Sequence, residues 1–219
     1  MPKVGLPPHH EWTHRSGAYD AIAAALAAAA HPDYASALLT KHQAEQLQKL
    51  RTGAYYITNF LTTFSSAGKA ITANRLYAIP FFISRPMTAD RIGVQVATLA
   101  AGSLRLGLYA DGVNLYPGAL LLDAGVVDTG TTGLKELTIN QALSSGLVWL
   151  AMLANAAPSL YQVGGANRMD LLGSPTGLDT ANAAWYVAQT YGALPNPFPA
   201  AGSLDPDLWW LGLRFSSMD

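Results

Sequence analysis

The stretch RIGVQVATLAAGSLRLGLYADG, residues 91–112, decides the fold. In RIGVQVATL, every second residue from Ile92 to Val96 is apolar, which is the period of a β-strand with one buried face. In SLRLGLY, the same pattern runs from Leu104 to Leu108. The turn sequences Ala-Gly-Ser and Asp-Gly bound this second run. The residues expected on the opposite face of the second strand are Arg105, Gly107 and Tyr109.

The same sequence pattern, short apolar or alternating runs separated by turn residues, continues from residue 53 to the C-terminus. About nine such runs predict a mainly β fold, an antiparallel β-sandwich of two stacked sheets. Strands do not alternate with helices, which disfavours folds built on a parallel sheet. A proline-rich stretch, residues 193–206, is expected to form an extended crossover before the last strand. The expected strands are 55–61, 75–83, 91–98, 104–109, 120–127, 134–139, 147–153, 185–191 and 208–215.

The N-terminal quarter has a different composition. Residues 1–17 contain prolines and glycines that interrupt regular structure, so we expect an extended arm. Residues 18–51 are alanine-rich and predict two short helices, separated where His31 precedes Pro32. An alanine helix buries little side chain, so this segment is expected to serve as an anchor or oligomerisation element. The sandwich domain is expected to cover residues 52–219.

Composition excludes several classes of function. Charged residues make up 12% of the 219 residues, about half the usual share, so part of the surface is expected to be covered by partner subunits. The net charge is −1 and no basic run occurs, which disfavours nucleic acid as a partner. The absence of cysteine excludes disulfides and thiolate zinc sites. The apolar run at 21–30 is too short to span a bilayer, so no membrane insertion is expected.

The segment HEWTH, residues 10–14, matches the H-E-x-x-H signature of zinc peptidases. That chemistry requires both histidines on one helix, one turn apart, with a third ligand from elsewhere. Here two prolines precede the motif and Gly17 follows it, which leaves little room for a helix. We therefore interpret the motif as part of the arm, with His10 and His14 able to bind zinc adventitiously.

Acidic residues offer two further kinds of site. A pair of carboxylates could support glycoside hydrolysis, but most of the acidic residues fall in expected turns, where aspartate commonly bonds its own backbone. Asp111 and Asn114, in the sequence DGVN, could contribute oxygen ligands to a calcium ion. The carboxylates considered for a catalytic pair are Asp111, Asp123, Asp128, Glu136, Asp170 and Asp179.

Aromatic residues suggest a binding role more strongly. The chain has five tryptophans and ten tyrosines, more than the core of one sandwich needs. Exposed aromatic rings can stack on pyranose rings, because one face of a sugar is apolar. Tyr109 and Tyr116 flank the expected Asp-Gly turn, and Tyr161 precedes a long glycine-containing loop. These three tyrosines are the candidates for glycan binding, with core or interface packing as the alternative.

Residues 74–125, together with GLVWLAMLAN (146–155) and LRTGAYY (50–56), carry a family resemblance. They resemble the jelly-roll-like β-sandwich modules of tailed-phage virion proteins, tail fibres among them. The likeness covers about residues 50–155 and the final strand, and implies a fold and a virion context but no catalytic residue. The likeness rests on an R-x-G-x-Y-x-D strand, a Pro-Gly turn and an L-x-D-x-G strand. In this chain these motifs correspond to Arg105, Gly107, Leu108, Tyr109 and Asp111, then Pro117 and Gly118, then Leu121, Asp123 and Gly125.

These observations favour a structural component of a phage particle, located in the virion as a fibre, spike or decoration subunit. Residues 1–51 would bind other virion proteins, and a homo-oligomer, a trimer by preference, is expected. The alternative is a carbohydrate-binding adhesin that recognises glycans of a host surface. A metal-dependent or glycosidic hydrolase is the third hypothesis, and the sequence disfavours it. We expect no enzyme activity and no cofactor.

Overall fold

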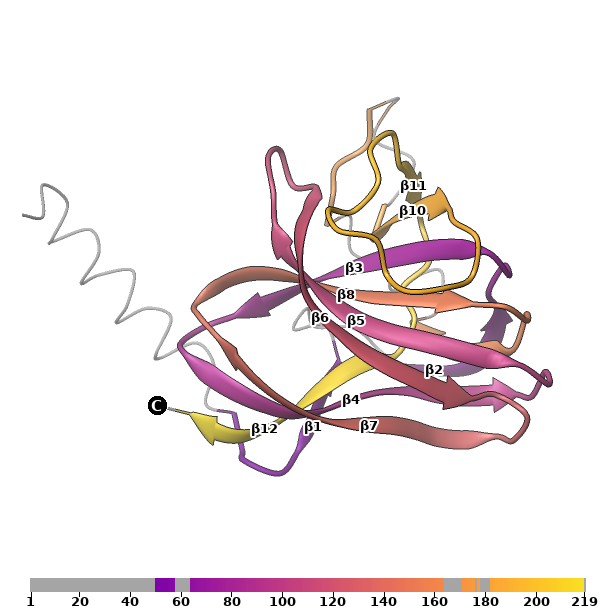
Figure 1. Cartoon of the computed structure of the whole chain (residues 1–219), viewed down its shortest axis with the longest axis horizontal. Coiled ribbons are helices and arrows are strands. Elements are labelled where there is room, and N and C mark those ends of the chain that lie inside the picture. Colours follow the sequence, from indigo (N-terminus) through magenta and orange to yellow (C-terminus); the bar gives the residue numbers. More distant parts are fainter. Residues whose placement is uncertain (1–49, 58–63, 164–170, 176, 178–181, 219) are drawn as a thin grey trace, which may run out of the picture. The chain divides into compact units, whose positions relative to one another are not determined.

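The computed structural model describes residues 50–218 except 58–63, 164–170, 176 and 178–181 (Figure 1). Residues from Leu50 onward form one compact unit. The described residues fold into twelve strands and contain no helix. Among them, therefore, nothing has the length and hydrophobicity of a membrane-spanning helix. The expected arm and the expected helices, up to residue 49, lie outside the described residues.

Two antiparallel sheets confirm the expected β-sandwich. Every strand pairing within them is antiparallel, as short loops between neighbouring strands require. Sheet A consists of β1 (Tyr55–Ile57), β12 (Leu211–Met218), β4 (Met87–Thr98), β9 (Ser159–Val163) and β2 (Phe64–Ala70) in that order, with β7 (Gly133–Leu143) also paired to β4. Sheet B has the order β11 (Ser203–Asp205), β10 (Ala184–Ala188), β3 (Arg75–Ile83), β8 (Gly146–Ala154), β5 (Ser103–Asp111) and β6 (Pro117–Asp128).

The central pairings are nested around one hairpin. β5 pairs with β6, β4 pairs with β7, and β3 pairs with β8. The chain therefore forms a long double-stranded ribbon whose successive strand pairs alternate between the sheets: β5–β6 in sheet B, β4–β7 in sheet A and β3–β8 in sheet B (Figure 1). The tight turn at residues 112–116 closes this ribbon, and Gly112 N donates to Tyr116 O at 2.8 Å.

The main core lies between the sheets and follows the expected alternation. Ile92 and Val96 are at most 1% exposed, and Leu104 and Leu108 are fully buried. The neighbouring central strand β8 is buried over most of its length, because the sandwich interior covers one side of it and a loop covers the other. The period-two pattern of residues 91–109 therefore identified the inward-facing side chains correctly.

A second apolar cluster lies on the outer face of sheet B. The loop between β10 and β11, residues 189–202, crosses this face and is called the strap below (Figure 1). Leu194 and Phe198 of the strap pack on Tyr109 and Trp149 of the sheet. The proline-rich stretch is extended as expected up to residue 202, but Ser203–Asp205 form strand β11 instead of continuing the crossover. The strap closes a hydrophobic surface that would otherwise face water.

Several elements differ from those expected. Strands β2 and β9 were not expected, and they pair with each other in sheet A. β9 lies in the stretch after Pro158, which the glycine-rich sequence suggested would be a loop. The last strand begins at Leu211 rather than Leu208, because Trp209 forms only an isolated bridge with Gln162.

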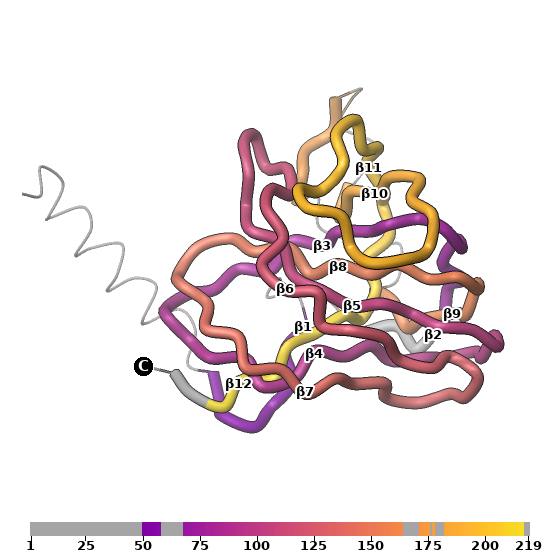
Figure 2. Tube along the Cα trace, viewed as in Figure 1, coloured from indigo at the N-terminus to yellow at the C-terminus, as the bar shows by residue number. Residues whose placement is uncertain are grey.

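The described chain begins and ends at one end of sheet A. β1 pairs with β12 through Tyr55 and Arg214, so the segment at Leu50 runs beside the C-terminal strand (Figure 2). Gly53 N donates to Phe215 O at 2.8 Å and fixes the first turn to that strand. The first described strand therefore lies at the edge of sheet A, beside the last one.

Candidate functional site

The outer face of sheet A carries charged side chains that bind one another. A bulge in β4 lies between Ala89 and Arg91, so Asp90 as well as Arg91 reaches the outer side. Arg214 of β12 lies directly beside Arg91. Its Nε donates to Asp90 Oδ1 at 3.0 Å and its Nη2 donates to Asp90 Oδ2 at 2.6 Å. This bidentate geometry fixes both side chains on the sheet.

A second contact crosses the sheet from β1 to β7. The hydroxyl of Tyr55 on β1 donates to Glu136 on β7, and Arg91 Nε lies 3.5 Å from the other oxygen of Glu136. Between them, Gly212 of β12 pairs with Gly93 of β4, so no side chain rises from the sheet under this bridge. A Cβ on Gly93 would lie 2.9 Å from Lys135 O and 3.3 Å from Glu136 Cβ. The two glycines therefore allow the bridge to lie flat.

The hydrogen bonds and ion pairs on this face shift the pKa values of Tyr55, Asp90 and Arg214. Burial raises the pKa of Tyr55, and the hydrogen bond to Glu136 raises it further. The hydrogen bond from Arg214 lowers the pKa of Asp90, and the same bond raises the pKa of Arg214. At neutral pH, two guanidinium groups therefore face two carboxylates, and the charges on this part of the sheet balance.

An aromatic pair lies on the same face, in the direction of the C-terminal end of β4. Tyr161 of β9 and Trp210 are stacked, with ring centroids 5.2 Å apart and an angle of 24° between the planes. Trp210 N donates to Tyr161 O at 2.8 Å, which holds the two segments together. Both side chains are half-buried.

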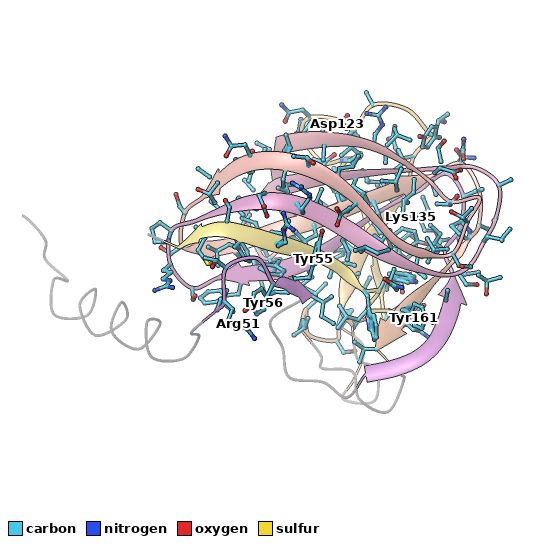
Figure 3. The ribbon with its side chains drawn as sticks, turned by 90° about the horizontal axis from the view of Figure 1, so that it is seen from below. Arg51, Tyr55, Tyr56, Asp123, Lys135 and Tyr161 are labelled. Atoms are coloured by element: carbon cyan, nitrogen blue, oxygen red, sulfur yellow. The ribbon has the colours of Figure 1, made fainter. Side chains whose placement is uncertain are left out.

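The charged bridge and the aromatic pair form one strip. Leu160 pairs with Val96, and both side chains point inward, so Tyr161 lies on the outer side at the level of Gln95. Gln95 is four residues along β4 from Arg91, a separation of about 13 Å along the strand. Figure 3 shows Tyr55 near the middle of the view and Tyr161 toward its lower right. We name this strip the outer platform; it comprises Tyr55, Asp90, Arg91, Gln95, Glu136, Tyr161, Trp210 and Arg214.

Two of the three candidate tyrosines lie elsewhere and hold the strap. Tyr109 is completely buried, and its hydroxyl donates to Pro195 O at 2.8 Å. Tyr116 donates to Pro199 O at 2.6 Å and accepts from Gly202 N at 2.9 Å. The buried ring of Tyr109 therefore offers no face to a sugar. The hydroxyl of Tyr116 both donates to and accepts from the backbone of the strap. Of the three candidates, Tyr161 is the one placed on the outer platform.

Rings also surround these two tyrosines. Phe198 of the strap meets Tyr109 edge to face at 5.3 Å and Tyr116 at 5.6 Å. Trp185 meets Tyr116 at 5.0 Å. The tyrosines that flank the turn therefore belong to the packing that the sequence analysis considered as the alternative to sugar binding.

The candidate calcium residues form a turn. Asp111 Oδ1 accepts from Trp149 Nε1 at 2.9 Å, and Asn114 has a φ of 59°, the left-handed conformation common for asparagine in turns. Within the described residues, no three histidine, cysteine or acidic side chains come together in a way that could hold a metal ion. His10 and His14 lie outside the described residues.

The acidic residues considered for catalysis have separate structural partners. Asp123 binds Arg105 Nη1 through both oxygens, at 2.8 and 2.9 Å, and also accepts from Leu194 N of the strap. Asp128 accepts from Gly130 N at 3.0 Å, as expected for a turn. Asp170 and Asp179 lie outside the described residues.

One acidic pair was not anticipated. Asp205 and Asp207 are buried where the chain leaves sheet B, and Lys69 of β2 binds Asp207. Burial raises the pKa of Asp205, and the charge of Asp207 adds to this effect. Asp207 N donates to Asp205 Oδ1 at 2.8 Å around Pro206. This geometry makes the pair part of a turn that an ion pair fixes to β2.

The outer platform was only partly visible in the sequence. Tyr55, Arg91 and Glu136 are far apart in the chain, and no spacing rule connects them. A weak signal existed, because Gly93 and Gly212 each occupy an outward position of an alternating run, and glycines within strands often mark close approach. Comparison with models of known protein families and with curated proteins yields no match for this chain.

Proposed function

We propose that this protein is a structural subunit of a tailed-phage particle, with a jelly-roll-like sandwich that projects from the virion as part of a fibre, spike or decoration. Residues 1–51 attach the subunit to other virion proteins and bring copies together, by preference as a trimer. The proposal assigns the protein no catalytic activity, no cofactor and no role in binding nucleic acid or inserting into membranes.

The observation that carries this proposal is the way in which the sandwich closes upon itself. The strap seals the outer face of sheet B, where Tyr109 and Tyr116 donate hydrogen bonds to strap carbonyls and Asp123 accepts one from Leu194 N. The nested pairing of β3 through β8 supports the jelly-roll-like description. A rigid domain whose described carboxylates serve turns and ion pairs suits a structural role better than catalysis.

The edges of the sheets support assembly through the N-terminal region. β6 and β7 are the outermost strands of their sheets along one side of the sandwich. On β7, Lys135 pairs with the inward-facing Val94, so a charged side chain points toward the interior. On β6, three register shifts against β5 twist the edge. Both devices oppose the addition of a further strand at these two edges, which agrees with attachment through residues 1–51.

Light scattering tests this assignment. The full chain is expected to form a defined oligomer, whereas a chain that begins at residue 52 is expected to remain folded and to be a monomer. A truncated chain that retains the oligomer mass would refute the role of residues 1–51. Peptide mass spectrometry of purified particles provides the second test, because a virion subunit must be present there at a fixed copy number.

A second candidate function is supported by the outer platform. Sheet A, unlike sheet B, has an outer face that the described chain does not seal with a strap, and this face carries Tyr55, Tyr161 and Trp210. Aromatic rings beside paired charges are suited to binding polyhydroxylated ligands. The sandwich could therefore also act as an adhesin for host surface glycans, and the two functions are compatible in one subunit.

A further inference from the structure

We propose that the outer platform binds a neutral polysaccharide whose chain runs along β4, with one sugar ring on Tyr55 and another on the Tyr161–Trp210 pair. This inference rests on the second candidate function above and gives it a site, a ligand class and a direction.

The first argument is the orientation of Tyr55. Its hydroxyl is bound to Glu136 on the far side of β4, and Arg214 lies 6.0 Å from the centre of its ring. A ring that is fixed at its tip and has a guanidinium group near it lies along the sheet rather than upright. Gly93 and Gly212 lie in the row that this bridge crosses, so these two positions place no side chain between the ring and the sheet, while the Arg214 guanidinium lies over one face of the ring. One face of Tyr55 is therefore available for stacking.

The second argument concerns the ligand's charge. Arg214 is bound by Asp90, and Arg91 is bound by Glu136. A charged ligand would have to break one of these pairs, and the broken pair would offset its gain. Hydroxyl groups can instead donate to the carboxylates and accept from the guanidinium groups while both pairs persist. The balanced charge therefore selects a neutral, hydroxyl-rich ligand.

The third argument is the spacing. Tyr55 lies at the level of Arg91, and Tyr161 lies at the level of Gln95, about 13 Å farther along β4. This separation exceeds the size of one pyranose ring, so a single sugar cannot contact both aromatic sites. A chain of several sugars can, and Gln95, at the level of Tyr161, offers an amide to its hydroxyls. We therefore infer that affinity increases with chain length until both sites are occupied.

Affinity electrophoresis of the full chain tests the proposal with dextran, mannan, galactan and hydroxyethyl cellulose as neutral probes, and with alginate and dextran sulfate as charged probes. At least one neutral polysaccharide is expected to retard the wild-type protein. Tyr161→Ala is expected to weaken that binding about tenfold, the loss expected when one stacking contact is removed. Tyr161→Phe, which keeps the ring, is the matched control and is expected to bind like the wild type.

Tyr55→Phe tests whether binding depends on the orientation of the Tyr55 ring or only on the presence of an aromatic ring. It keeps the ring but removes the bond to Glu136, so binding is expected to weaken by about threefold to tenfold, since the ring is no longer held flat. Val126→Ala, an exposed position on sheet B, is expected to leave binding unchanged. Circular dichroism of each variant verifies that the fold is retained.

The outcomes distinguish the two proposals. If no neutral polysaccharide retards the protein, or if the charged probes alone do so, the inference and the adhesin function are refuted, while the role as a virion subunit still depends on the light-scattering test. If a neutral polysaccharide binds but neither Tyr161→Ala nor Tyr55→Phe weakens it, the adhesin function survives and the site proposed here is wrong.

Discussion

Tyr116→Phe provides a direct test of how the strap is held. The hydroxyl of Tyr116 donates to Pro199 O at 2.6 Å and accepts from Gly202 N at 2.9 Å, so the substitution removes two hydrogen bonds and leaves the ring contacts with Trp185 and Phe198 in place. Each such bond contributes about 1 kcal/mol net. We therefore expect the free energy of unfolding to fall by about 2 kcal/mol, which corresponds to a decrease in Tm of about 4–8 °C for a domain of this size.

Urea denaturation followed by tryptophan fluorescence measures this change, and hydrogen exchange locates it. The amide of Gly202 is expected to lose protection, since its acceptor is removed, while amides of the central strand β8 change only with the global stability. Tyr161→Phe is the matched control, because that hydroxyl anchors no part of the strap, and its effect is expected to stay within about 0.5 kcal/mol. An unchanged midpoint together with unchanged protection of Gly202 would show that the strap does not depend on this hydroxyl.

Three further results are expected. Asp205→Asn should stabilise the protein at neutral pH. Burial raises the pKa of this carboxyl, so the stability of the wild type falls as pH rises from the unfolded-state pKa to the folded-state pKa. Thermal melts between pH 3 and 7 should show a smaller dependence of stability on pH in the variant. Gly93→Ala should cost about 1–3 kcal/mol, because the added Cβ lies 2.9 Å from a backbone oxygen of β7, and a wild-type urea midpoint would contradict the close approach. Arg214→Gln should let the pKa of Asp90 rise toward its ordinary value, as an NMR titration of the carboxyl carbon would reveal; the wild type loses the contribution of this pair as pH falls through the lowered pKa.

The sequence predicted the sandwich because its central strands obey simple rules. β3 has the same limits, Arg75–Ile83, as the expected strand, and the alternation around Val94 and Leu106 identified the buried side. β2 was missed because FSSAGKA has small and polar residues with no apolar alternation. β9 was missed because its five residues follow a proline and precede glycines. Such strands form when a neighbouring strand supplies their hydrogen bonds, which is tertiary information.

Tyr109 shows where period-two reasoning stops. The pattern correctly placed it on the face of β5 opposite to Leu104 and Leu108, and that face was taken as open. The structure buries it completely, because the strap returns from more than 80 residues later in the chain to cover this face. A pattern along one strand specifies which side a residue occupies, but not what covers that side. Tyr161 was chosen because it precedes a long glycine-containing loop, and there the described chain supplies a stacked Trp210 rather than a cover.

The contrast between the two outer faces has a physical basis that bears on function. On sheet B, Tyr109 and Trp149 point outward and form an apolar surface whose exposure to water would be unfavourable. The 14 residues of the strap, 189–202, cover this surface. Sheet A presents Arg91, Glu136 and Arg214 outward, and their mutual pairing makes that face stable in water without a cover. The proposed glycan site therefore uses the face of the sandwich on which aromatic rings lie beside paired charges, and binding there would not require the core to open.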